Sequence, residues 1–171
     1  MSYPVRPVIA RAWRLISPKW RRLPFSGESA RINGGRWNAI GQSALYLATD
    51  PTTAATEFYQ GIPKPGVLVP YDIDARALAD LTDGAGRPAD AALAEALSAD
   101  WKTIARIKHR TPPSWAIARD LIAAGAEGAL IPSAQTPGGT NLVLWRWHDA
   151  AAPGEGAALT LLDPERALAG R

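Results

Sequence analysis

Alternation of apolar and polar residues predicts short β-strands toward both ends of this chain of 171 residues. In the first half, a two-residue period favours strands at 9–16, 44–48 and 67–74. In the second half, strands are predicted at 128–131, 141–147 and 157–162. Successive side chains of a strand point to opposite faces of a sheet, so this pattern indicates sheets with a buried face.

Helix signals lie between these strands. Asp50 is a candidate N-cap and Pro51 suits the first helical position, which predicts a helix ending near Tyr59. Further helices are predicted over 89–97, 99–107 and 115–124. The segment Lys19–Gly35 is polar and punctuated by Pro and Gly, and it is predicted to be a long functional or mobile loop.

Strands outnumber strand–helix–strand units, which predicts the α+β class with mixed, mostly antiparallel sheets and flanking helices. The sequence has no internal repeat. The Ala- and Gly-rich tract at 150–158 is typical of a surface loop and not of a domain linker. We therefore expect residues 1–171 to form a single domain.

Composition indicates the cellular compartment and excludes some kinds of site. The chain has no cysteine, which excludes disulfides and cysteine–metal sites and fits a reducing compartment. The N-terminus lacks the apolar core of a signal peptide, and no apolar run reaches the ~18–20 residues of a membrane span. We expect a cytoplasmic protein without a membrane partner.

The net charge of +3 is unevenly distributed. The first fifty residues hold eight Lys or Arg but only Glu28 and Asp50 as acids. A basic N-terminal third suggests an anionic partner such as a phosphorylated small molecule, a nucleic acid or an acidic protein. A solvated charged face is the alternative interpretation.

Several common sites are missing from the sequence. There is no P-loop, no dinucleotide glycine fingerprint and no G-x-S-x-G elbow. His109 and His148 are isolated, so no metal site is expected. The basic run 102–110 could contact nucleic acid, but no nucleic-acid-binding motif accompanies it, and direct binding is not expected.

Candidate chemistry is concentrated in residues 34–57. Paired glycines at its start permit positive φ or a close approach of backbone to ligand. Arg36 is a fork donor suited to phosphate or carboxylate, and Trp37 and Tyr46 offer flat surfaces. Glu57 supplies a carboxylate, expected in the first turns of the helix. Together these residues suggest a nucleotide pocket.

Each candidate also has a structural interpretation. Arg14, near a strand end, could be a surface charge. Tyr46, inside an apolar strand, could be a core aromatic with a satisfied hydroxyl. A carboxylate at Glu57 would be favoured by the helix macrodipole whatever its function. Ser133 follows a strand, where serine commonly forms turns.

Taken in order, these residues resemble the RES domain family, which is named for its Arg, Glu and Ser. The matching segments span most of the chain and comprise Trp13-Arg14-Leu15, Gly35-Arg36-Trp37-Asn38 with Gly41, residues 44–48, Ala54, Ala55 and Glu57, residues 128–133, and residues 141–145. Residues 80–110 carry no segment that matches the family.

The resemblance implies a fold similar to that of ADP-ribosyltransferase toxins and a role as the toxin of a bacterial toxin–antitoxin pair. It implies NAD as substrate, without a metal, and cleavage of the nicotinamide–ribose bond with transfer to water, phosphate or a protein target. The implied partner is an antitoxin with an Xre-like DNA-binding part and a segment that blocks the active site.

Carried over residue by residue, the resemblance marks a catalytic and NAD-binding set consisting of Arg14, Arg36, Tyr46, Glu57 and Ser133. Trp37 and Asn141 are supporting positions, and Arg31 is an alternate for one arginine role. Two other classes stay open: a nucleotide- or protein-binding module without turnover, and a nucleic-acid binder that uses the basic face.

Overall fold

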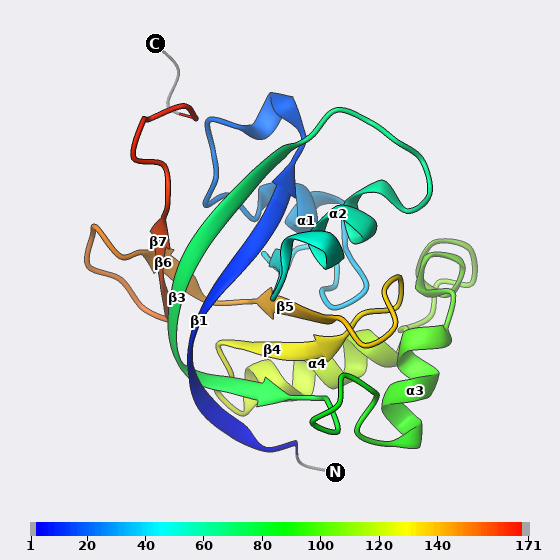
Figure 1. Ribbon diagram of the computed structural model, residues 1–171. Helices are drawn as coiled ribbons and strands as arrows, with labels where there is room; N and C mark the ends of the chain where they lie inside the picture. Colours follow the sequence, from blue (N-terminus) through cyan, green and yellow to red (C-terminus); the bar gives the residue numbers. More distant parts are fainter. Residues whose placement is uncertain (1–2, 169–171) are drawn as a thin grey trace.

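The computed structural model describes residues 3–168, in which a sheet of seven strands is flanked by helices (Figure 1). The strands are β1 (Val5–Ile16), β2 (Leu45–Ala48), β3 (Val67–Asp80), β4 (Gly128–Pro132), β5 (Thr140–Leu144), β6 (Trp147–Asp149) and β7 (Ala157–Leu161). The helices are α1 (Glu28–Asn33), α2 (Pro51–Tyr59), α3 (Ala91–Ser98) and α4 (Pro113–Ala123). A 3-10 turn, η1 (Pro18–Trp20), and a π-helical turn, η2 (Thr103–Ile107), complete the described elements.

The strand order is β1-β2-β5-β4-β3-β7-β6. Because β1 pairs with β3 as well as with β2, five strands form a closed ring of pairings, and β7 and β6 extend from β3. The pairs β3–β4 and β6–β7 are parallel and the others are antiparallel. The predicted α+β class with a mixed, mostly antiparallel sheet is confirmed.

Alternation along β4 and β5 divides the core into two clusters. Leu130 and Leu142 join a cluster enclosed by the ring of strands, together with Tyr71 of β3. Ile131 and Val143 point the other way and pack with residues of α3 and α4. In Figure 1, α3 and α4 accordingly lie below β4, while α1 and α2 lie above β5. Each buried aliphatic side chain contributes about 1.5–3 kcal/mol to folding.

The predicted start of α2 is confirmed. The Asp50 carboxylate accepts hydrogen bonds from the Thr53 backbone N–H at 2.8 Å and from the Thr53 hydroxyl at 2.7 Å, and Pro51 occupies the first helical position. A capping interaction of this kind stabilises a helix by about 1 kcal/mol. It fixes where α2 begins and hence the direction in which its last turn presents side chains.

Two strands are longer than predicted, because β1 begins at Val5 and β3 ends at Asp80, and three further segments differ in kind from the sequence prediction. The segment Lys19–Gly35 is not a plain loop, because it contains η1 and α1. The helix predicted over 99–107 is largely a π-helical turn. The strand predicted over 141–147 is broken after Leu144, because the N–H groups of the next two residues both donate to the Glu127 carbonyl and leave the ladder.

No helix within residues 3–168 is both long enough and apolar enough to cross a membrane.

Candidate active site

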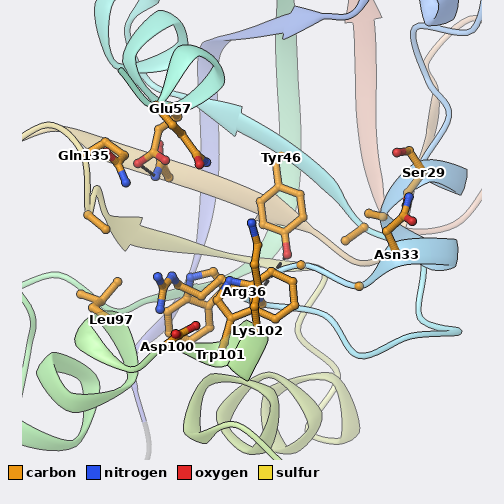
Figure 2. A pocket seen from close by; sticks show the side chains of 18 of the residues that line it. Ser29, Asn33, Arg36, Tyr46, Glu57, Leu97, Asp100, Trp101, Lys102 and Gln135 are labelled. Atoms are coloured by element: carbon orange, nitrogen blue, oxygen red, sulfur yellow. Dashed lines mark hydrogen bonds between the residues drawn. The ribbon is translucent and has the colours of Figure 1, made fainter. Parts of the chain in front are cut away.

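A cavity of about 620 Å³ opens between α1, α2 and the segment that joins α3 to η2. A smaller cavity of about 300 Å³ adjoins it. The wall common to both consists of Arg14, Tyr46, Glu57, Gln60 and Asn141. Figure 2 shows the larger cavity, with Glu57 and Gln135 on one side, Ser29 and Asn33 on the other, and Tyr46 between them. These volumes are in the range of small-molecule sites.

Glu57 lies in the last turn of α2 and not in its first turns, so that part of the prediction is wrong. The macrodipole is negative at a helix C-terminus and disfavours a carboxylate there. Helix electrostatics therefore cannot explain why an acid occupies this position. The half-buried side chain extends from α2 into the cavity (Figure 2).

Two side chains hold the Glu57 carboxylate at one oxygen. The Ser133 hydroxyl donates to Oε1 at 2.5 Å, and the Asn141 side-chain amide donates to the same oxygen at 2.7 Å. Within residues 3–168, Oε2 has no protein donor. The carboxylate is thus oriented through Oε1, which leaves Oε2 for a ligand in the cavity.

Ser133 also forms the turn that its position after a strand suggests. Its Oγ accepts from the backbone N–H of Thr136 at 2.9 Å and of Gln135 at 3.2 Å. These bonds fix the hydroxyl so that its hydrogen points to Glu57. The same hydroxyl therefore both forms the turn and orients the Glu57 carboxylate. Ser133 lies behind Glu57 and does not line the larger cavity.

Tyr46 contributes both a satisfied hydroxyl and a cavity wall. Its hydroxyl accepts from the Trp37 backbone N–H at 2.9 Å and donates to the Asn38 side-chain oxygen at 2.7 Å. Burial raises the pKa of this phenol, so it stays neutral. Asn38 donates in turn to the carbonyls of Ala30, Ala39 and Gln42. This network fixes the loop that carries Arg36.

The two glycines before Arg36 serve this network. Gly34 follows α1 with φ 70° and ψ 164°, a conformation largely restricted to glycine. A Cβ on Gly35 would lie 2.5 Å from the Tyr46 hydroxyl and 2.6 Å from the Asn38 side-chain oxygen. Gly35 therefore leaves room for the Tyr46–Asn38 hydrogen bond.

We expect Gly35→Ala to destabilise the fold by about 1–3 kcal/mol, because the added methyl overpacks a buried contact, and to lower activity by displacing the Arg36 loop. Gly41→Ala is the comparison for backbone strain without a clash, since Gly41 has φ 93° but no atom within 4 Å of the position that a Cβ would occupy, and it should lose stability but keep activity. Thermal unfolding and nicotinamide release measure the two effects. Loss of activity in both variants alike would contradict the specific role of Gly35.

The predicted arginines both lie at the cavity. Arg14 is not a surface charge, because burial lowers the pKa of its guanidinium, which donates to the Pro24 carbonyl at 3.3 Å. Arg36 donates to the carbonyls of Ala96 and Ala99 at 3.2 and 2.8 Å, at the C-terminal end of α3. Burial lowers the pKa of Arg36 as well, although both arginines remain charged at neutral pH.

Four cations line the larger cavity: Arg14, Arg36, Lys102 and Arg106. Within the described residues, none of them lies within 4.0 Å of a carboxylate oxygen. Five arginines elsewhere do have such a partner, namely Arg6, Arg11, Arg31, Arg87 and Arg119. Glu57 and Asp100 also line this cavity, so four cations face two carboxylates, and the remaining excess of positive charge is suited to an anionic ligand.

Two supporting candidates have other surroundings. Arg31 forms a bidentate pair with Glu28 on the exposed side of α1 and does not line either cavity. Trp37 lines the larger cavity, but its side chain is only 4% exposed and packs in the core cluster beside α3 and α4. Trp37 is thus placed as a wall and not as an open platform.

The segment before and within η2 supplies residues that sequence reasoning does not assign to this site. Asp100, Trp101, Lys102 and Arg106 all line the larger cavity. Arg106 donates to the Asn33 carbonyl at 2.9 Å and so connects η2 to α1. The only signal in the sequence is the basic run, which suggests a nucleic-acid surface instead of a cavity rim.

The arrangement combines an oriented carboxylate, unpaired cations and aromatic walls. Among residues 3–168, no group of three His, Asp or Glu side chains is placed to hold a metal ion. A positioned carboxylate can stabilise positive charge that develops in a transition state, and guanidinium groups can bind phosphate bidentately. The site is therefore suited to a phosphorylated substrate that becomes cationic as it reacts.

Comparison with known proteins gives three findings. The model of the RES domain family matches residues 11–162. The protein "Toxin Res" of Photorhabdus laumondii subsp. laumondii is 40% identical over 45 residues, a match that spans 26% of this chain and 29% of that protein. The M. tuberculosis MbcT–MbcA toxin–antitoxin complex contains a chain of similar fold, with a TM-score of 0.58 and 22% identity over 93% of this chain and 84% of that chain.

Proposed function

This chain belongs to the RES domain family, and on that premise we propose that it is the toxin of a toxin–antitoxin pair and cleaves the nicotinamide–ribose bond of NAD. The observation that carries the proposal is the Glu57 carboxylate, held at Oε1 where two cavities meet. Unpaired cations beside it match the anionic part of a dinucleotide.

The pyrophosphate is bound by the arginines. Arg14 and Arg36 line the cavity on which Glu57 also borders, and each has N–H groups beyond those that contact backbone carbonyls. Guanidinium–phosphate pairs are charge-assisted and often bidentate, which adds orientation to affinity. This binding fixes the ribose relative to Glu57.

Bond cleavage needs stabilisation of positive charge more than it needs an acid. The nicotinamide of NAD is already cationic, so the C–N electron pair leaves with a neutral nicotinamide and the ribose becomes oxocarbenium-like. Oε2 of Glu57 hydrogen-bonds a ribose hydroxyl and offsets this charge. The acceptor then forms the new bond to the same carbon and gives up its proton. Ser133 and Asn141 keep the carboxylate in position.

The acceptor of ADP-ribose is water, phosphate or a protein side chain. These three define a glycohydrolase, a phosphorylase and an ADP-ribosyltransferase, and the products separate them. Free ADP-ribose, its 1-phosphate or a modified protein would be detected by mass spectrometry after incubation with NAD in buffer, in phosphate or in cell lysate.

Location of the cations favours this enzyme over a nucleic-acid binder. Lys102 and Arg106, which belong to the basic run, line a concave cavity, and Lys108 and Arg110 are the exposed cations of that run outside it. A nucleic-acid backbone is better served by cations spread over an open surface. A binding module without turnover would not need an oriented carboxylate at the junction.

The same charge pattern supports the proposal of an antitoxin partner. A cavity with four unpaired cations would attract an acidic or carboxylate-bearing segment that occupies the position of the pyrophosphate. We propose that the cognate antitoxin, which carries an Xre-like DNA-binding part, inhibits the toxin in this way.

Expression in bacteria tests the proposal. We expect wild type to arrest growth and to deplete cellular NAD or modify proteins, and co-expression of the antitoxin from the neighbouring gene to restore growth. Glu57→Gln should grow normally, whereas Glu95→Gln, which removes a charge from the exposed face of α3, should remain toxic. Harmless wild-type expression with NAD unchanged and no modified protein would favour a binding module. Toxicity that survives in Glu57→Gln would reject this mechanism.

A further inference from the structure

The two adjoining cavities differ in chemistry. The larger one contains all four unpaired cations and the indole of Trp101. Beyond the common wall, the smaller one is lined by Trp13, Leu15, Leu47, Ala48, Ala54 and Phe58, which carry no charge. Arg14 belongs to the common wall, and the other three cations line the larger cavity alone. A ligand that borders Glu57 and enters both cavities would therefore meet more positive charge in the larger cavity and more apolar surface in the smaller one.

We propose that the adenosine diphosphate part of NAD binds in the larger cavity, with the adenine on Trp101 and the pyrophosphate at Arg14 and Arg36, and that the nicotinamide binds in the smaller cavity. This inference rests on the proposed function, and it makes Trp101 a residue that selects a dinucleotide over a mononucleotide.

Charge and size determine this orientation. The scissile bond must lie at Glu57, so the substrate has to extend in both directions from the common wall. Adenosine diphosphate is the larger, negatively charged half and fits the cavity of about 620 Å³ that holds the cations. The nicotinamide ring is flat and positively charged, and it fits the cavity of about 300 Å³, whose walls include the aromatic rings of Trp13 and Phe58. Aromatic faces attract cations.

Trp101 is placed as a platform. It is half-buried and lines the larger cavity, and Lys102 Nζ and Arg106 Cζ each lie 5.8 Å from its ring centroid. Trp115 supports it at a centroid distance of 6.1 Å. The Trp115 indole donates to the Gly35 carbonyl at 2.7 Å, which ties the platform to the Arg36 loop. An aromatic side chain with flanking cations is a common arrangement for binding a nucleobase and its phosphate.

Burial distinguishes Trp101 from the other tryptophan that lines the larger cavity. Trp37 is 4% exposed and packs in the core, whereas Trp101 is half-buried and can offer its ring to a ligand. The adjacent π-helical turn is a feature often found at functional sites.

Steady-state nicotinamide release from NAD and from nicotinamide mononucleotide tests the inference, because the mononucleotide lacks the adenosine. Trp101→Ala is expected to raise KM for NAD by roughly 5–150-fold, the effect of losing one base stack, while KM for the mononucleotide and kcat for both stay near wild type. Trp101→Phe should restore most of the affinity for NAD. Ile107→Ala, an exposed neighbour in η2 that lines neither cavity, is the control for a disturbed turn.

The affinity for ADP-ribose, measured by calorimetry, tests the adenine site without depending on the proposed cleavage of NAD. If wild type binds ADP-ribose and Trp101→Ala weakens that binding by a similar factor, the subsite stands even if no NAD is cleaved, and only the proposed activity fails. Equal losses with NAD and the mononucleotide, or a folded Trp101→Ala that matches wild type in KM for NAD and in ADP-ribose binding, would overturn the inference.

Discussion

Glu57→Gln is expected to release nicotinamide from NAD roughly 10²–10⁴-fold more slowly than wild type, the effect of removing one preorganised electrostatic contributor. The amide keeps the shape of the carboxylate but loses the charge that offsets the oxocarbenium. It also conflicts with its neighbours, since Oε1 now accepts from both Ser133 and Asn141. Most of the loss should be in kcat, because the interaction strengthens only in the transition state.

Glu95→Gln is the matched control for this loss. It removes the same charge from an exposed helical position outside the cavity and should leave turnover unchanged. Thermal unfolding of Glu57→Gln should remain cooperative, and its affinity for NAD should be close to that of wild type. Near wild-type nicotinamide release by a folded Glu57→Gln would show that the carboxylate is not the group that stabilises the reaction.

Arg14→Ala and Arg36→Ala are each expected to lower kcat/KM for NAD by roughly 10–150-fold, the scale of one lost hydrogen bond to a charged group. Both guanidinium groups are partly desolvated, and neither has a carboxylate oxygen within 4.0 Å among residues 3–168, so each can pair with the pyrophosphate without first breaking an ion pair. The effect should be in KM more than in kcat, because binding of the pyrophosphate precedes cleavage.

Arg21→Ala and Arg22→Ala provide the comparison for general electrostatics. Both arginines are exposed and line neither cavity, and an exposed charge is typically worth less than ~1 kcal/mol. Equal losses in all four variants would reject the arginine clamp. Because Arg36 also contacts the C-terminal carbonyls of α3, thermal unfolding must accompany its kinetics, and Arg36→Lys should retain the charge but lose part of the orientation.

Much of the fold can be predicted because its signals are local. The two-residue alternation of β2, β4 and β5 comes directly from the packing of one face against each core cluster, and the Asp50–Pro51 pair marks the start of α2. The closed ring of strands is not predictable in this way. It depends on the pairing of β1 with two partners that are far apart in the sequence.

Segments with weak local signals are predicted less well. The helix α1 has only six residues, and its N-cap, Gly27, has no side chain to mark its start, although the Ser26 hydroxyl accepts from the Glu28 backbone N–H at 3.2 Å. The break after Leu144 arises because Glu127, distant in sequence, accepts the next two N–H groups. The turn that carries Glu57 is predicted wrongly although both ends of α2 are predicted correctly, because in a helix that runs from Pro51 to Tyr59 position 57 lies in the last turn.

The residues proposed for the site fall into two groups. Arg14, Arg36, Tyr46, Glu57 and Asn141 lie together at the cavity, and Ser133 lies directly behind the acid. The resemblance to the family predicts all of these residues as parts of one site. Trp101, Lys102 and Arg106 cannot be found that way, because their segment matches no family motif and only the packing of η2 against α1 turns it toward the cavity.

The measurement that tests the proposed chemistry most directly is quantification of nicotinamide and NAD after incubation of the purified wild-type protein with NAD, in the presence and absence of phosphate. Cleavage at the nicotinamide–ribose bond predicts one nicotinamide released for each NAD lost, at a rate that falls in Glu57→Gln and not in Glu95→Gln. Intact NAD and no nicotinamide, with a protein that is folded and shown to bind NAD, would contradict it.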